Sequence, residues 1–290
     1  MTRRLPLAGK TALVTGVSRR RGIGFAVARR LAALGANVVI HHHSAHDLRL
    51  PWGGDDLGAV RDGVRDALTS DALFDDVSAD LSDATAATTA LDTAFGLTGD
   101  LDILVCNHAR SGDDGSILDM TPDRLDAFWD TNTRSTLLLT AEFARRKSGS
   151  DTGDPLRPGD PVPFAGPFSE PVGRVFWMTS GQVDAPMPGE VAYATSKAAL
   201  AGVTKTVAAE LMRLGIVLNT VNPGPVNTGY LDTETTDRDL EALDERFGSL
   251  PFGRVGVPED PANLIGWLAT QDGAWIVGQV LTSDGGFGLT

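Results

Sequence analysis

The sequence predicts an α/β protein: a doubly wound, parallel seven-stranded sheet of the Rossmann type with helices on both faces. Short β-branched runs alternate with longer segments of helical periodicity, and this alternation is typical of parallel sheets. Several of the short runs are apolar on both faces, as strands buried between two helical layers must be. A glycine-rich turn lies between the first strand and the first helix, where doubly wound folds have a tight connection.

Seven strands and seven helices are expected. The strands cover residues 11–15, 37–40, 73–79, 101–106, 174–179, 216–221 and 277–281, and the helices cover 23–34, 55–68, 83–95, 122–146, 191–214, 238–247 and 258–270. Ser82 is suited to cap the third helix, and Thr121 followed by Pro122 supplies an N-cap and a first-turn proline for the fourth. Residues 147–171 break the pattern, because six prolines remove backbone donors there. We expect a surface insertion, either a loop without a role or a flap over an active site or interface.

Composition limits the class of protein. The 290 residues, 42% hydrophobic and 22% charged, are enough for one large core, so residues 1–290 are expected to form a single domain. A formal net charge of -13 repels nucleic-acid backbones and anionic lipid surfaces, so neither partner is expected. Cys106 is the only cysteine and cannot form an internal disulfide, which favours the cytoplasm. Pro6 and Lys10 interrupt the apolar stretch near residue 1, so we expect neither a signal peptide nor a spanning helix.

The turn over residues 15–24 predicts a phosphate-binding site. Its glycines let the backbone approach a pyrophosphate, which the free N–H groups and the positive end of the following helix would stabilise. It also carries three consecutive arginines, which favour an additional phosphate on the ligand. The candidate coenzyme residues in this turn are Gly16, Ser18, Arg19, Arg20, Arg21, Gly22, Ile23 and Gly24.

The end of the second strand bears on which dinucleotide binds. Folds that prefer NAD usually have an acidic residue there to hold the ribose hydroxyls, whereas this chain has His41, His42 and His43. We therefore expect NADP(H) to be preferred over NAD(H), with His41 as a possible ligand of the adenosine phosphate. We expect no metal at His41, His43 and His46, because neighbouring strand residues face opposite sides and no cysteine or close carboxylate set completes a shell.

Three side chains form the candidate catalytic group. Tyr193 and Lys197 are four residues apart, so on a helix they share one face. A nearby ammonium stabilises a phenolate and lowers the tyrosine pKa toward the working pH, where the phenol can donate or accept a proton. Ser180, at the carboxyl end of the fifth expected strand, lies where parallel sheets bind ligands and can donate a hydrogen bond to a substrate oxygen.

The order of these motifs resembles the short-chain dehydrogenase/reductase family. The resemblance starts from the segment Tyr193-Ala194-Thr195-Ser196-Lys197, thirteen positions after Ser180, and covers nearly the whole chain outside residues 147–171. The family implies that Lys197 also holds the nicotinamide ribose and that Asn132 positions a water that relays protons to this lysine. The other coenzyme contacts that it implies are Asp80 and Leu81 at the adenine, Asn107 and Ala109 on the adenosine side, and Pro223, Gly224, Val226 and Thr228 near the carboxamide.

The sequence departs from the family pattern at three places. Five residues rather than three separate Gly16 from Gly22, so which arginine meets the phosphate is open. The family's Asn-Asn-Ala-Gly pattern appears here as Cys106-Asn107-His108-Ala109, which would put a bulky imidazole beside the cofactor. The proline-rich insertion precedes the fifth strand, where it can reshape a pocket or an oligomer interface.

The resemblance implies hydride transfer between a nicotinamide and a ketone or secondary alcohol, most simply in the carbonyl-reducing direction. Residues 229–252 are expected to form a lid over the substrate, and residues 275–286 look like those of 3-oxoacyl-carrier-protein reductases. Arg145, Arg146 and Lys147 could dock an acidic carrier protein, although cations near a helix C-terminus are also simply stabilising. An NAD-dependent alcohol dehydrogenase and a non-catalytic NADP-binding regulatory protein stay open as alternatives. The family also implies a homodimer or homotetramer built on the helices at 122–146 and 191–214.

Overall fold

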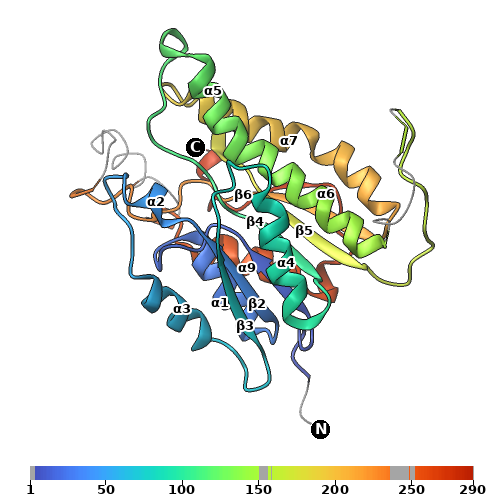
Figure 1. Ribbon diagram of the computed structural model, residues 1–290. Helices are drawn as coiled ribbons and strands as arrows, with labels where there is room; N and C mark the ends of the chain where they lie inside the picture. The colour runs from blue at the N-terminus through green and yellow to red at the C-terminus, as the bar shows by residue number, and fades with distance from the viewer. Residues whose placement is uncertain (1–3, 150–155, 158, 236–247, 249–251, 290) are drawn as a thin grey trace.

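A computed structural model describes residues 4–149, 156–157, 159–235, 248 and 252–289, and every structural statement below concerns these residues. They form one all-parallel sheet of seven strands in the order β3-β2-β1-β4-β5-β6-β7. This order reverses direction between β1 and β4, so the predicted doubly wound Rossmann fold is confirmed (Figure 1). The strands are β1 (Thr11–Val14), β2 (Asn37–His42), β3 (Phe74–Ser78), β4 (Ile103–Cys106), β5 (Gly173–Met178), β6 (Ile216–Asn222) and β7 (Val280–Thr282).

Helices cover both faces of the sheet. On one face α1 (Ile23–Ala33), α3 (Leu57–Arg65) and α9 (Glu259–Leu268) enclose a core that includes Val14, Leu31 and Ile265. On the other, α4 (Ala86–Thr98), α6 (Ser135–Ser148) and α7 (Val191–Met212) enclose a core that includes Leu13 and Phe143. Every residue of β1, β2, β4, β5 and β6 is buried, as expected for strands between two helical layers.

Several predicted boundaries differ from the structure by two or three residues, and two of them have a clear physical reason. Ser82 does not cap a helix that begins at Asp83, because Asp83 Oδ1 accepts hydrogen bonds from Thr85 N and Oγ1 and so forms a turn; α4 begins at Ala86. β7 begins at residue 280 rather than 277, because Gly278 adopts a left-handed φ of 69° that interrupts the extended backbone. The short helix α2 (Ser44–Asp47) was not predicted, and the helix predicted at 238–247 lies outside the described residues.

The helix predicted at 122–146 is real but not regular. Thr121 Oγ1 accepts a hydrogen bond from Arg124 N and Pro122 is the first helical residue, as predicted, so α5 (Pro122–Phe128) begins where expected. From Trp129 to Arg134 the chain forms a π-helical turn, η2, before α6 continues. Such a turn holds one extra residue, and it is often found at functional sites.

The insertion predicted at 147–171 begins later than expected, because residues 147–148 still belong to α6. Its other described residues, 149, 156–157 and 159–171, contain neither helix nor strand. It packs against the carboxyl end of α7, where Ala165 N donates to Arg213 O at 2.9 Å, and it is the yellow-green trace at that end of α7 in Figure 1. Its role as an insertion or flap stays a prediction.

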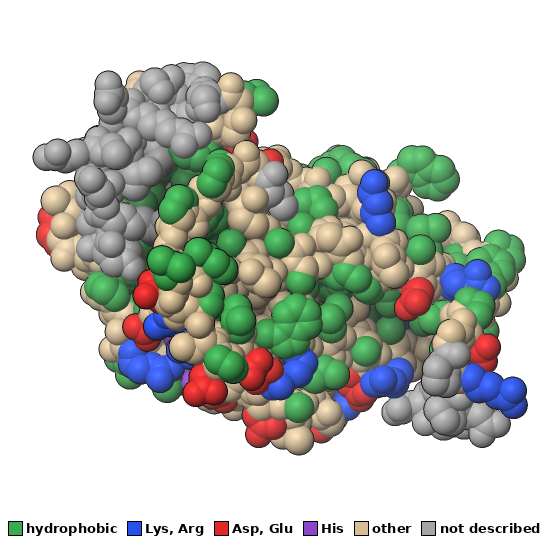
Figure 2. All heavy atoms as spheres, turned by 90° about the horizontal axis from the view of Figure 1, so that it is seen from above, with side chains coloured by type: hydrophobic (Ala, Val, Ile, Leu, Met, Phe, Trp, Pro, Cys, Tyr) green, Lys and Arg blue, Asp and Glu red, His purple; other side chains and the backbone are tan. Residues whose placement is uncertain are grey.

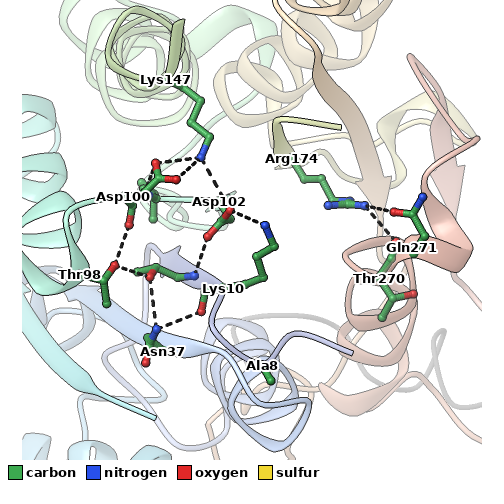
Figure 3. A network of polar contacts seen from close by, with 12 residues as sticks. Ala8, Lys10, Asn37, Thr98, Asp100, Asp102, Lys147, Arg174, Thr270 and Gln271 are labelled. Atoms are coloured by element: carbon green, nitrogen blue, oxygen red, sulfur yellow. Dashed lines mark hydrogen bonds and ion pairs between the residues drawn. The ribbon is translucent and has the colours of Figure 1, made fainter. Parts of the chain in front are cut away.

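Ion pairs hold the amino-terminal edge of the sheet together (Figure 3). Lys147 Nζ, on α6, lies 2.6 Å from Asp100 Oδ2 and 3.7 Å from Asp102 Oδ1, and Lys10 Nζ lies 2.9 Å from the same Asp102 oxygen. Arg146 pairs with Glu142 and Asp92 at 2.8 Å each. Arg145 also lies 3.3 Å from Glu142, so all three basic residues considered for carrier docking pair with acidic residues of the same chain.

Among the described residues, no helix is both long enough and apolar enough to cross a membrane. No group of three or more histidine, cysteine or acidic side chains in this part of the chain is arranged to hold a metal ion.

Candidate active site

A cleft of about 1400 Å³ opens at the carboxyl ends of the central strands. Ligands of open α/β sheets bind at this edge, next to the point where the strand order reverses. Most of the predicted site residues lie on its wall: Gly16, Ser18, Arg19, Gly22, Ile23, His41, Asp80, Leu81, Asn107, Ala109, Ser180, Tyr193, Lys197, Pro223, Gly224, Val226 and Thr228. Four do not, namely Arg20, Arg21, Gly24 and Asn132.

The glycine-rich turn is held against the end of β4 by close backbone contacts. Gly16 has a φ of 73°, and a Cβ atom there would lie 2.7 Å from the Cα of His108. A Cβ atom on Gly24 would lie 2.5 Å from Asn107 Nδ2. That amide nitrogen donates to the carbonyl oxygens of Thr15 and Gly16, at 3.1 and 3.2 Å. The glycines are therefore required by the fold of the turn itself, and Asn107 fixes its position beside the cleft.

The three arginines of the turn point to different partners. Arg20 forms an ion pair with Asp55 at 2.7 Å, and Arg21 forms one with Asp232 at 2.5 Å. Arg19 alone lies on the cleft wall, where it donates to Thr228 O while its buried Nη1 has no hydrogen-bond partner. Burial lowers its pKa from the ordinary value of 12.5, and an anion in the cleft would offset that cost. Of the three, Arg19 is the one placed to meet a cofactor phosphate.

His41 supports the turn from within. Its Nδ1 accepts from Gly16 N at 3.3 Å, so Nε2 carries the proton and donates to Ala79 O at 2.9 Å. Burial lowers its pKa to about 4, and the ring is neutral at physiological pH. Both ring nitrogens are used by the backbone, which leaves no N–H for an adenosine phosphate.

His108, the bulky departure from the family pattern, is also a buried neutral link. Ser135 Oγ donates to Thr131 O, so it accepts from His108 Nε2 at 2.7 Å, and Nδ1 in turn accepts from Thr15 Oγ1 at 2.7 Å. Burial lowers the His108 pKa well below 6.5. The imidazole thereby connects β1 to the start of α6 and remains uncharged.

Asn132, in the π-helical turn, is fully buried beneath the cleft. Its Oδ1 accepts from Arg110 N at 2.6 Å, and its Nδ2 donates to Arg110 O and to Ser196 Oγ, at 3.1 and 2.9 Å. Ser196 Oγ donates to Tyr193 O at 2.7 Å. Asn132 thus joins the loop after β4 to the first turns of α7, and its predicted role in proton relay stays a prediction.

The candidate acid-base group stands on α7. Lys197 Nζ lies 5.9 Å from the centroid of the Tyr193 ring and donates to Met178 O, at the end of β5, at 3.0 Å. Lys197 is 2% exposed, and burial lowers its pKa from 10.5 to about 8. The edge of the Phe128 ring packs against Tyr193, with centroids 6.4 Å apart. Ser180 lies two residues beyond the end of β5 and lines the same cleft.

Sequence reasoning missed two parts of this site. Asp114, in the loop after β4, accepts hydrogen bonds from Ala192 N and Tyr193 N. Trp52, in the loop after α2, packs its ring against Tyr230, with centroids 6.1 Å apart, and both line the cleft. These residues meet partners 79 and 178 positions away in the sequence, and no local motif marks such contacts.

A dinucleotide fits the residues on this wall. The turn exposes the start of α1 to the cleft, Arg19 has an unpaired buried nitrogen, and a phenol, an ammonium and a hydroxyl lie beyond them on the same wall. This combination in a doubly wound sheet is typical of dinucleotide-dependent oxidoreductases.

Comparisons with known proteins agree. A family model described as enoyl-(acyl carrier protein) reductase matches residues 16–152 and 163–288, and its gap falls inside the proline-rich segment. The chain is 34% identical to an uncharacterized oxidoreductase, YjdA, of Bacillus subtilis over 96% of both chains. It is 34% identical to an NADPH-dependent aldehyde reductase-like chloroplastic protein of Arabidopsis thaliana, over 98% of this chain and 96% of the other. A short-chain dehydrogenase/reductase of Serratia marcescens has a similar solved structure, with a TM-score of 0.75 and 31% identity over 98% and 99% of the two chains. The chain belongs to the short-chain dehydrogenase/reductase family, and it is an oxidoreductase.

Proposed function

We propose that the protein is an NADP(H)-dependent oxidoreductase that transfers a hydride between the nicotinamide and a ketone or secondary alcohol, in the carbonyl-reducing direction. The observation that carries this proposal is the pair on α7, where a buried ammonium lies 5.9 Å from the ring of a tyrosine on the cleft wall. Ser180 and the glycine-rich turn line the same cleft.

The bound coenzyme supplies the hydride, and the side chains of the chain handle the proton. Tyr193 donates its phenolic proton to the substrate oxygen, and Ser180 donates a hydrogen bond to that same oxygen. The positive charge of Lys197 stabilises the phenolate that results. In the oxidation of an alcohol the same groups work in reverse, with the phenolate as the base.

Two features bear on the coenzyme. Arg19 offers an unpaired nitrogen to a phosphate, and the end of β2 has histidines where NAD-preferring folds have an acid. Asp47 of α2, however, also lines the cleft and accepts a hydrogen bond from Ser18, which favours the NAD-dependent alcohol dehydrogenase as the second candidate. Titration with NADPH and NADH at one fixed salt concentration separates the two. Tighter NADPH binding is expected, and equal or weaker NADPH binding contradicts the preference.

Substitution of the phenol tests the reaction itself. With a panel of ketones, aldehydes and secondary alcohols followed by nicotinamide absorbance, we expect turnover by the wild type and a loss of at least about 1000-fold in kcat for Tyr193→Phe, because the proton donor is gone. Coenzyme binding should stay within about twofold, since the phenyl ring still fills the same space. Wild-type turnover that persists in Tyr193→Phe contradicts the mechanism.

We further propose that the enzyme is a cytoplasmic homodimer or homotetramer, joined through the helices expected at 122–146 and 191–214, which are α5, α6 and α7 in the structure. On α5 and the turn after it, Leu125 and Trp129 are 39% and 44% exposed, and α7 turns Ala198 and Gly202 outward. Figure 2, seen from above, shows hydrophobic side chains spread over this side of the molecule and most charged side chains near the rim. Light scattering should give twice or four times the mass of 30.5 kDa, and Leu125→Asp should shift it toward the monomer.

A further inference from the structure

The first turn of α7 is capped by another part of the chain. The first N–H groups of a helix have no partner within it and must be satisfied from outside. Here Val191 N donates to Gly115 O at 3.2 Å, Ala192 N to Asp114 Oδ1 at 3.1 Å, and Tyr193 N to Asp114 Oδ2 at 2.7 Å. One carboxylate therefore binds two successive backbone N–H groups, and the second belongs to the residue that carries the phenol.

The residues next to α7 do not supply this cap themselves. Glu190 stands at the N-cap position, and its side chain makes no capping hydrogen bond to the helix. Its main-chain oxygen accepts from Ala194 N, one residue beyond Tyr193, at 2.8 Å. The cap comes from a loop that precedes the helix by 76 residues, counted from Asp114 to Glu190.

The loop is built to hold Asp114 in this position. Gly112 and Asp113 have φ values of 73° and 53°, so two successive left-handed residues turn the chain sharply just before it. Gly115 N donates to Asp114 Oδ1 at 2.7 Å, which fixes the orientation of the carboxylate. A left-handed φ at a residue other than glycine is uncommon and marks a segment held by its surroundings.

We propose that Asp114 is a positioning residue for the reaction, and this inference rests on the proposed function. Its carboxylate fixes the backbone of Tyr193, and with it the direction in which the phenol enters the cleft relative to Lys197 and Ser180. Because Asp114 also lines the cleft wall, it ties the loop that borders the coenzyme to the helix that carries the acid-base group. A shift of about 1 Å in a reacting group can reduce turnover about 100-fold.

The test separates positioning from simple capping. In Asp114→Ala we expect kcat to fall about 10- to 100-fold while the Kd for NADPH stays within about twofold. Asp114→Asn keeps the shape and one acceptor oxygen, so it should fold and show a smaller loss in kcat, between those of the wild type and Asp114→Ala. Asp119→Ala is the matched control, because Asp119 caps a single turn in the same loop through Ser116, is absent from the cleft wall, and should leave kcat unchanged.

Hydrogen exchange at the first turn of α7 gives a readout that does not need turnover. Asp114→Ala should lose protection at the amides of Ala192 and Tyr193, and Asp119→Ala should not. A kcat for Asp114→Ala within twofold of the wild type would overturn the inference, because Asp114 would then only cap the helix. A loss of coenzyme binding as large as the loss in kcat would overturn it as well. If the wild type reduces no carbonyl and oxidises no alcohol in the panel, the proposed function fails instead, and the exchange data still report whether Asp114 holds this turn.

Discussion

The Lys197 ammonium has a lower pKa than an ordinary lysine. No carboxylate contributes to its pKa, and burial beneath the cleft disfavours the charged form, so the pKa falls to about 8 from 10.5. The charge that would stabilise the Tyr193 phenolate in the proposed mechanism is therefore present at neutral pH and disappears within the range in which activity is readily measured.

This places a limit on the alkaline side of the pH profile. Below pH 8 the free enzyme carries the Lys197 charge; above it the charge is lost and the phenol becomes a weaker acid. We expect kcat/KM for carbonyl reduction to decline as the pH rises through about 8, because this ratio reports groups of the free enzyme. Lys197→Arg, which stays charged, should lack this decline even where its overall rate is lower. A wild-type profile that is flat from pH 7 to pH 10 would show that the lysine charge does not matter.

Arg19 and Arg20 form a matched pair for coenzyme recognition. Only Arg19 lines the cleft, and Arg20 is paired with Asp55. Loss of a charge-assisted contact to the extra phosphate of NADPH is worth about 1.5–3 kcal/mol, so Arg19→Ala should weaken NADPH binding by about tenfold or more. NADH binding should change much less. Fluorescence titration of both coenzymes checks this, with Arg20→Ala expected to behave like the wild type; equal losses for NADPH and NADH in Arg19→Ala would rule out a phosphate contact.

At the scale of elements, the strands and the starts of helices follow from local chemistry, whereas the irregular turn at 129–134 does not. Apolar periodicity across 122–146 is that of one helix, and a single extra residue shifts the pattern too little to be recognised. The shift nevertheless brings Asn132 beneath Arg110 and Ser196, which are its partners. The sequence thus predicts that Asn132 is in a helix near the site, but not that its side chain is buried.

The start of α1 has no room for a side chain at Gly24. A methyl group on Gly24 would lie 2.6 Å from Gly16 O as well as against Asn107, so Gly24→Ala must displace the glycine-rich turn. We expect it to lower the free energy of unfolding by about 1–3 kcal/mol and to weaken the binding of both coenzymes. Gly96, in α4, has no atom within 4 Å of the added methyl, so Gly96→Ala should raise stability by about 0.5–1 kcal/mol. Urea unfolding and coenzyme titration measure both effects, and a Gly24→Ala protein as stable as the wild type would contradict the close approach.

For the whole molecule, the sequence predicts the sheet and its helices because these depend on residues close together in the chain, whereas much of the cleft wall is predicted through the family resemblance. The choice among the three arginines depends instead on Asp55 and Asp232, which remove two of them from the cleft. The histidine proposed as a phosphate ligand is likewise taken up by backbone groups of other strands and turns. Such pairings are decided by tertiary contacts, and composition or spacing cannot show them.

The three basic residues in the last turn of α6 also differ in their tertiary contacts, and this difference allows a final test. The Arg145 side chain is exposed and pairs with Glu142, whereas the Lys147 side chain is 7% exposed and joins α6 to Asp100 and Asp102 beside β4. In Lys147→Met, Asp102 still pairs with Lys10 and still accepts a hydrogen bond from Thr11 N. Because these contacts partly compensate the buried carboxylate, the free energy of unfolding should fall by about 1–2 kcal/mol. Arg145→Met should change stability by less than about 0.5 kcal/mol.

Urea midpoints of the two variants measure this difference at pH 7, without added salt and at about 1 M salt. Salt separates the two cases because it screens an exposed ion pair more than a buried one. The expected order is a clear loss for Lys147→Met that persists in salt and no resolved change for Arg145→Met. Equal and small changes in the two urea midpoints would mean that these ion pairs contribute little to stability and that Arg145, Arg146 and Lys147 are free to bind an acidic partner. A large loss for Lys147→Met alone would instead show that Lys147 joins α6 to the amino-terminal edge of the sheet, opposite the proposed active-site cleft.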